Sequence, residues 1–167
     1  MLYTWQGGIE AGNASADVLT GAVTPSGKLP DTITYDIADY PSTENFGDEE
    51  RNYYAEDIYV GYRYFETFAP EKVQFPFGFG LSYTEFQTQV TRAKVQGEGK
   101  EAVAVIEACV TNTGAVYSGK EVVQVYYEAP QGKLGQPVRQ LAAFQKTGLL
   151  APGESQKLTF TIKAVSY

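Results

Sequence analysis

Apolar and polar residues alternate along the second half of the chain, where short turns separate five segments. The segments are 86–95, 101–111, 121–128, 138–146 and 156–163. A two-residue period is typical of strands with one buried face, and short turns favour antiparallel neighbours, so we predict an antiparallel β-sandwich. Its expected core residues are Val123, Val125, Leu158, Phe160 and Ile162. After the second segment, Asn112 and Gly114 permit left-handed backbone at the end of the strand.

The first half of the chain carries a different pattern. Residues 13–21 predict one short helix with Asn13 as its N-cap. The stretch 29–34 should be extended, and the acidic, tyrosine-rich stretch 36–57 should be a long loop. Residues 58–65 are aromatic and β-prone. One helix and a few extended pieces cannot cover a sheet face, so this half should belong to a larger domain.

Length and composition exclude several classes of protein. The chain has 167 residues, which is too short for a (β/α)₈ barrel of ~250 residues. Its formal net charge of -7 repels phosphate backbones and anionic lipid, so neither nucleic acid nor a membrane is an expected partner. The single cysteine, Cys109, allows no internal disulfide. Because histidine is absent, Ser-His-Asp catalysis and histidine-based zinc sites are excluded, and we expect no metal and no cofactor.

The N-terminal residues 1–6 have neither the basic nor the apolar stretch of a secretory leader, and no apolar run approaches the ~20 residues of a membrane span. We therefore expect a soluble chain, with the cytoplasm favoured over secretion. Asn13-Ala14-Ser15 is a glycosylation sequon, but we expect Asn13 to cap a helix instead of carrying a glycan.

Two charge and glycine patterns have simple structural explanations. The glycines of residues 7–12 have the spacing of a phosphate loop but lack its lysine, so a P-loop is rejected. The acidic residues between 44 and 57 could supply the two facing carboxylates of a glycosidase. A charge run of this kind normally forms a solvated loop, which is what we expect here.

Motifs along nearly the whole chain resemble glycoside hydrolase family 3. Those of the first half are Gln6–Ala14, Asp17–Gly21, Pro25–Pro30, Ile58–Phe65 and Phe75–Thr84. They resemble the end of the family's α/β sandwich domain and the signature leading out of it. Those of the second half are Val110–Gly114, Gly119–Tyr126, Pro137–Leu141 and Leu150–Ser155. They are similar to the family's fibronectin type III-like domain.

The resemblance implies two domains and a mainly β fold. Residues 1–81 would be the C-terminal portion of the α/β sandwich domain, and residues 82–167 a fibronectin type III-like domain truncated at its C-terminus. A sandwich short of about two strands leaves sheet edges unpaired, so self-association through these edges is expected.

The resemblance also implies a function for the parent protein. It would be a retaining exo-β-glycosidase acting on a β-linked glucoside or oligosaccharide, with the remaining domains of the enzyme as partners of this chain. The family's nucleophilic Asp and acid/base Glu lie in motifs that are absent here, so no catalytic residue is assigned, and the isolated chain should be inactive. Trp5, Gln6 and Glu10 lie in the one loop expected to approach a substrate.

An alternative is a non-catalytic β-sandwich that binds carbohydrate or a protein through aromatic side chains. Tyr126 and Tyr127 fall on opposite faces of their predicted strand, which leaves a single stacking platform at best.

Overall fold

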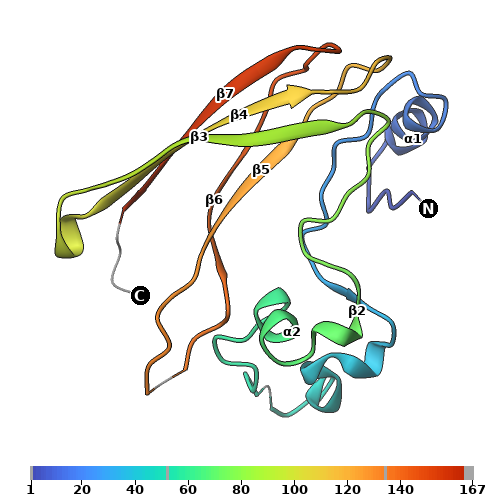
Figure 1. Ribbon diagram of the computed structural model, residues 1–167. Helices are drawn as coiled ribbons and strands as arrows, with labels where there is room; N and C mark the ends of the chain where they lie inside the picture. Colours follow the sequence, from blue (N-terminus) through green and yellow to red (C-terminus); the bar gives the residue numbers. More distant parts are fainter. Residues whose placement is uncertain (1, 52, 134, 164–167) are drawn as a thin grey trace. The chain divides into compact units, whose positions relative to one another are not determined.

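The computed structural model describes residues 2–51, 53–133 and 135–163 (Figure 1). The chain divides into two compact units. Residues Lys28–Gly80 and Gln124–Phe144 form unit 2, and the remaining described residues form unit 1. The domain boundary expected between residues 81 and 82 stays a prediction.

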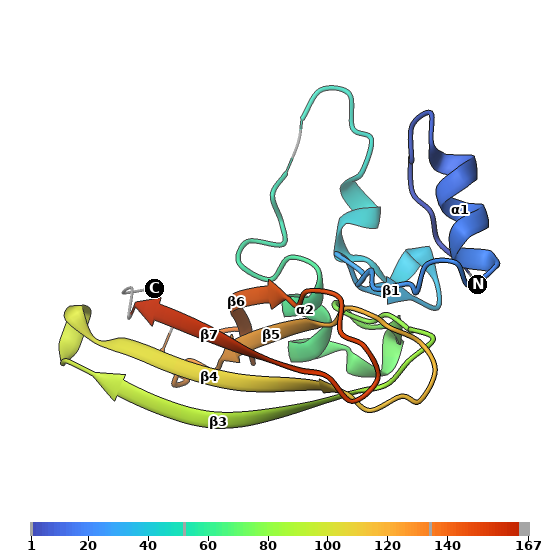
Figure 2. The same ribbon diagram turned by 90° about the horizontal axis from the view of Figure 1, so that it is seen from above.

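Unit 1 contains a three-stranded antiparallel sheet of order β3-β4-β7 (Figure 2). Its strands are β3 (Phe86–Gln96), β4 (Val103–Asn112) and β7 (Ser155–Lys163). Along β7, Leu158 and Phe160 are buried while Thr159 and Thr161 are exposed. Because one face of the strand is buried and the other meets solvent, the two-residue period of the sequence is explained.

A second sheet pairs β5 (Val122–Tyr127) with β6 (Gln140–Lys146). All five predicted strands are therefore present, with ends within two residues of the predicted ones, and the mainly β class is confirmed. Among the predicted core residues, Leu158 and Phe160 are buried, whereas Val123, Val125 and Ile162 are only half-buried.

The outer strands of the three-stranded sheet are β3 and β7. A break in the register of β3 between Val90 and Arg92 marks a β-bulge, which makes an edge harder to pair with another chain. The register of β7 against β4 is continuous from Ser155 to Lys163. Self-association through such edges stays a prediction.

The backbone of the turn after β4 differs from the left-handed conformation considered for Asn112 and Gly114. Neither Asn112 nor Gly114 has a positive φ angle. Gly114 is required for a different reason, because a Cβ atom there would lie 2.0 Å from Oγ1 of Thr84. Asn112 is fully buried and serves as a hydrogen-bonding centre for the surrounding loops. The motif is therefore explained by side-chain packing and not by left-handed backbone.

Helix α1 spans Ala11–Leu19, two residues before the predicted position. Its N-cap is Glu10, so the assignment of Asn13 as the cap is wrong. The cause is a turn at Gly8, whose φ angle is 65° and whose carbonyl accepts a hydrogen bond from Ala11 N at 3.3 Å. This turn brings the chain into helical conformation earlier. Gly21, with a φ angle of 79°, follows the helix as expected.

Unit 2 contains a helix that the sequence did not predict. Helix α2 spans Tyr62–Phe68, so the β-prone reading of residues 58–65 is wrong. Phe65 is fully buried on this helix, and its ring meets that of Tyr40 edge-on at a centroid distance of 5.4 Å. Tertiary burial of the aromatic face therefore overrides the local strand preference.

The other elements of the chain are short. In unit 2, β1 (Ile33–Thr34) pairs with β2 (Val73–Phe75). The predicted loop 36–57 contains two 3₁₀ turns, Ile37–Asp39 and Pro41–Asn45. Two more 3₁₀ turns are Pro70–Lys72 and Gly99–Glu101.

Candidate functional site

The loop before α1 has a fixed and unusual backbone. Trp5 takes a φ angle of 49°, in the left-handed region that residues other than glycine seldom adopt. Gly7 lies so close to α1 that a Cβ atom on it would be 2.7 Å from the Cβ of Ala11. Together with the turn at Gly8, this close approach sets where the side chains before the helix point. Backbone strain of this kind is often found at functional sites.

The three side chains expected to bind substrate are all exposed. The Trp5 ring meets the Tyr3 ring edge-on, with centroids 4.6 Å apart. Oε2 of Glu10 accepts a hydrogen bond of 2.7 Å from Nδ2 of Asn13. In the part of the chain that the structure describes, Trp5, Gln6 and Glu10 do not bond to one another. The loop therefore presents an aromatic face, an amide and a carboxylate to solvent, which are groups suited to stacking on a sugar and bonding its hydroxyls.

The acidic run around residues 48–51 is a solvated turn. Oδ1 of Asp48 accepts hydrogen bonds from the backbone N–H of Glu50 at 2.9 Å and of Arg51 at 3.0 Å. All four side chains of this run are exposed. The carboxylates of Glu49 and Glu50 thus lie on a turn held by Asp48, as expected for a loop stabilised by its own side chains.

Among the described residues, no three or more Cys, Asp or Glu side chains gather in a way that could hold a metal ion. The described helices are all too short to cross a membrane as apolar spans.

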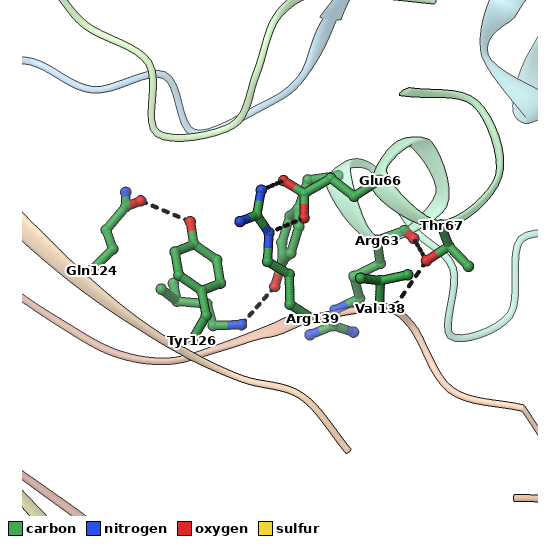
Figure 3. A network of polar contacts seen from close by, with 9 residues as sticks. Arg63, Glu66, Thr67, Gln124, Tyr126, Val138 and Arg139 are labelled. Carbon is green, nitrogen blue, oxygen red and sulfur yellow. Dashed lines mark hydrogen bonds and ion pairs between the residues drawn. The ribbon is translucent and has the colours of Figure 1, made fainter. Parts of the chain in front are cut away.

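A network of polar contacts inside unit 2 links α2 to the strands β5 and β6 (Figure 3). At its centre, Glu66 binds the guanidinium of Arg139 with both carboxylate oxygens, Oε2 to Nε and Oε1 to Nη2, the latter at 2.8 Å. The guanidinium lies over the ring of Tyr126, 5.4 Å from its centroid. The Tyr126 hydroxyl donates a 2.7 Å hydrogen bond to Oε1 of Gln124. An ion pair, a cation–π contact and a hydrogen bond therefore form one continuous chain.

Two backbone groups next to Arg139 also bond to α2. The N–H of Val138 donates to Oγ1 of Thr67 at 3.1 Å, and the N–H of Leu141 donates to the hydroxyl of Tyr62 at 2.9 Å. The Tyr62 ring stacks on that of Phe77, with centroids 4.6 Å apart. Side chains of α2 therefore satisfy backbone donors that β-sheet pairing leaves open at the start of β6.

The surroundings of the ion pair change two pKa values. The hydrogen bond to Glu66 raises the pKa of Arg139, so the guanidinium stays charged at any ordinary pH. Burial raises the pKa of the Tyr126 hydroxyl, with a smaller contribution from the Glu66 charge. Tyr126 is thus a neutral hydrogen-bond donor engaged by Arg139 and Gln124, and its ring is not the free stacking platform that the alternative function needs.

Comparison with known proteins assigns two segments of the chain. Residues 1–83 match the model of the glycosyl hydrolase family 3 C-terminal domain. Residues 121–166 match the model of the fibronectin type III-like domain. The chain belongs to glycoside hydrolase family 3.

β-Glucosidases match nearly all of this chain. A β-glucosidase of Ruminococcus albus is 53% identical over 162 residues, which are 97% of this chain and 16% of that protein. β-Glucosidase A of Butyrivibrio fibrisolvens is 50% identical over an alignment of 177 positions, gaps included, that covers 97% of this chain and 21% of that protein. The chain thus spans about a fifth or less of the length of these relatives.

Solved β-glucosidase structures have the same fold. The β-glucosidase of Paenibacillus barengoltzii aligns with a TM-score of 0.92 and 64% identity, covering 95% of this chain and 17% of that one. β-Glucosidase 3B of Thermotoga neapolitana aligns with a TM-score of 0.84 and 44% identity, covering 95% and 22%. The predicted fibronectin type III-like β-sandwich and the family 3 assignment are therefore confirmed.

The polar network joins the two family 3 segments and was not found from the sequence. Glu66 lies in the segment matched to the C-terminal domain, and Arg139 in the segment matched to the fibronectin type III-like domain. Both belong to motifs that carry the family resemblance or adjoin one, but 73 positions separate them. The only local signal was a lone basic residue in an otherwise uncharged motif, Pro137–Leu141.

Proposed function

We propose that the chain is a supporting part of a retaining exo-β-glycosidase that hydrolyses β-glucosides. The observation that carries this proposal is the 53% identity to a β-glucosidase over 97% of the chain. In this proposal, residues 1–81 complete an α/β sandwich domain and residues 82–167 form a fibronectin type III-like domain. The remaining domains of the parent enzyme supply the nucleophilic Asp and the acid/base Glu.

The first test is the activity of the chain by itself. We expect no hydrolysis of an aryl β-glucoside above the buffer rate. A retaining mechanism needs two carboxylates ~5–5.5 Å apart on either side of the sugar, and in this proposal both belong to the remaining domains of the parent enzyme. Release of the chromophore is measured over hours at high protein concentration, with a full-length family 3 β-glucosidase as the positive control. Turnover that Glu49→Gln or Glu50→Gln abolishes would show that the chain carries its own catalytic carboxylate and would end the proposal.

We also propose that the loop containing Trp5, Gln6 and Glu10 contributes to substrate binding in the parent enzyme. The exposed Trp5 ring and its left-handed backbone support this role, as does the Glu10 carboxylate at the start of α1. The loop binds and does not react, because none of the catalytic motifs of the family falls on it.

Trp5→Ala in the longer enzyme should raise KM by roughly tenfold, equivalent to ~1.4 kcal/mol of binding, and leave kcat nearly unchanged. Tyr54→Ala is the matched control, since Tyr54 is an exposed aromatic residue remote in sequence from this loop. An unchanged KM for Trp5→Ala, or an equal rise for Tyr54→Ala, would remove the loop from the binding site.

A further inference from the structure

We propose that helix α2 carries an intramolecular docking site for the segment Val138–Leu141, with Arg139 as the residue that the site recognises. We call the three side chains Tyr62, Glu66 and Thr67 the α2 dock. All of them lie within unit 2, as does the docked segment. The dock would fasten the fibronectin type III-like segment to the family 3 C-terminal segment independently of sheet pairing.

The α2 dock combines two neighbouring parts of the helix surface. Tyr62 and Glu66 are four residues apart, so their side chains lie one above the other. Thr67 is the next residue after Glu66 and lies about 100° further around the helix. Thr67 donates its own hydroxyl proton to the carbonyl of Arg63 at 2.6 Å, which leaves its oxygen oriented to accept from Val138. Three acceptors on one short helix thus meet three donors from four consecutive residues.

The chemistry of the dock selects a guanidinium group. Two parallel N–H···O bonds between Arg139 and Glu66 match the planar fork of arginine, which the single ammonium of a lysine cannot reproduce. The Glu66 side chain is 18% exposed and the Arg139 side chain 48%, so solvent screens the carboxylate less than the guanidinium. The Tyr126 ring against the guanidinium adds a cation–π attraction.

The dock also holds the turn that carries the family signature. Gly78 has a φ angle of 80°, and a Cβ atom on it would lie 2.4 Å from Oε1 of Gln124, the same oxygen that accepts from Tyr126. Phe77, the neighbouring residue, stacks on Tyr62 of the dock. Contacts from α2, the 75–80 turn, β5 and β6 therefore depend on one another, which makes the group cooperative.

The test is a double-mutant cycle on the full chain with Arg139→Ala, Glu66→Ala and both together. Hydrogen exchange of the amides of α2 and of residues 138–141 is the local measurement, and thermal unfolding the global one. Each single variant should lose protection in both segments roughly tenfold and lower the midpoint by roughly 2–6 °C. The double variant should be little worse than either single variant, because both remove the same interaction.

Arg92→Ala is the matched control. Arg92 pairs with Glu107 through one guanidinium nitrogen at 3.1 Å, between β3 and β4 of unit 1. Its removal should leave exchange in α2 unchanged. Arg139→Lys should behave like Arg139→Ala, whereas the exchanged pair Glu66→Arg with Arg139→Glu should recover part of the lost protection.

Three results would overturn the proposal. The first is that the losses of midpoint and protection in the two single variants add up in the double variant. The second is unchanged hydrogen exchange in α2 after Arg139→Ala. The third is wild-type behaviour of Arg139→Lys, which would mean that Arg139 and Glu66 form an ordinary surface charge pair. If Arg139→Ala does not fold, Thr67→Val supplies the answer, because it removes one acceptor of the dock while keeping its shape. Lost protection at residues 138–141 in that variant supports the dock, and unchanged protection contradicts it.

Discussion

Phe160→Ala should destabilise the chain by ~3–5 kcal/mol, a large part of the ~5–15 kcal/mol that holds a typical domain together. Phe160 is 4% exposed and lies opposite Ile106 of β4, between the buried Leu158 and the half-buried Ile162 on the same face of β7. Removing its ring leaves a cavity in the centre of that face, which the antiparallel ladder cannot close without breaking its register. A fall of roughly 6–20 °C in the unfolding midpoint is the expected measurement.

Thr161→Ala is the control for this facing assignment. Thr161 is the next residue along β7, is exposed, and lies opposite Val105. Its replacement removes little buried surface, so the change should stay within about 1 kcal/mol. If the two variants unfold at the same temperature, the assignment of the buried face of β7 is wrong.

The strands could be predicted because their cause is local. Turn residues separate the strands, and the two-residue alternation is clearest in β7, where the exposed Thr159 and Thr161 interleave with the buried Leu158 and Phe160. That alternation is a property of the strand's own sequence and does not depend on which element packs against the sheet. The family resemblance then named the fold, because several motifs occur in the right order along one chain.

Helix α2 could not be predicted because its cause is tertiary. Its sequence, Tyr62–Phe68, contains three aromatic residues in its first four positions, which favour strands over helices on propensity alone. The helix forms where Gly61, with a φ angle of 58°, turns the chain and the buried Phe65 anchors it. The α2 dock was missed for the same reason, since its partner Arg139 lies 73 positions away.

The loop before α1 shows a third situation, in which residues were proposed from a motif and their geometry was not predicted. Trp5, Gln6 and Glu10 were chosen by motif, but the sequence did not indicate that Trp5 takes left-handed backbone or that Asn13 bonds to Glu10. The misplaced helix cap had the same origin. Asn13 is a good capping residue, but the turn at Gly8 starts the helix before the chain reaches it.

Asn112→Ala is expected to produce a destabilisation comparable to that of Phe160→Ala, through hydrogen bonds instead of packing. The Asn112 amide is fully buried and uses its whole bonding capacity. Nδ2 donates to the carbonyls of Tyr117 and Leu150, each at 2.9 Å, and Oδ1 accepts from Thr84 at 2.6 Å and from Gly114 N at 3.1 Å. Leaving several buried groups without partners costs ~1–3 kcal/mol for each that water cannot reach, so we expect a total of ~3–5 kcal/mol.

Thr111→Ala is the control for exposure, because Thr111 precedes Asn112 on β4 and also loses a side-chain hydrogen bond, of 2.7 Å to Ser155, at an exposed site. Its midpoint should fall by only a few degrees.

Asn112→Asp separates bonding from size, since it keeps the shape but turns two donors into acceptors facing two carbonyl oxygens. Burial and these oxygens would raise the pKa of the new carboxyl above its usual ~3.9, so folding would favour the protonated form. The variant should therefore lose stability as the pH rises above that value, while Asn112→Ala should show the pH dependence of the wild type. Thermal unfolding across a pH series measures both, and a pH-independent loss in Asn112→Asp would show that the amide is not held in a dry, fully bonded site.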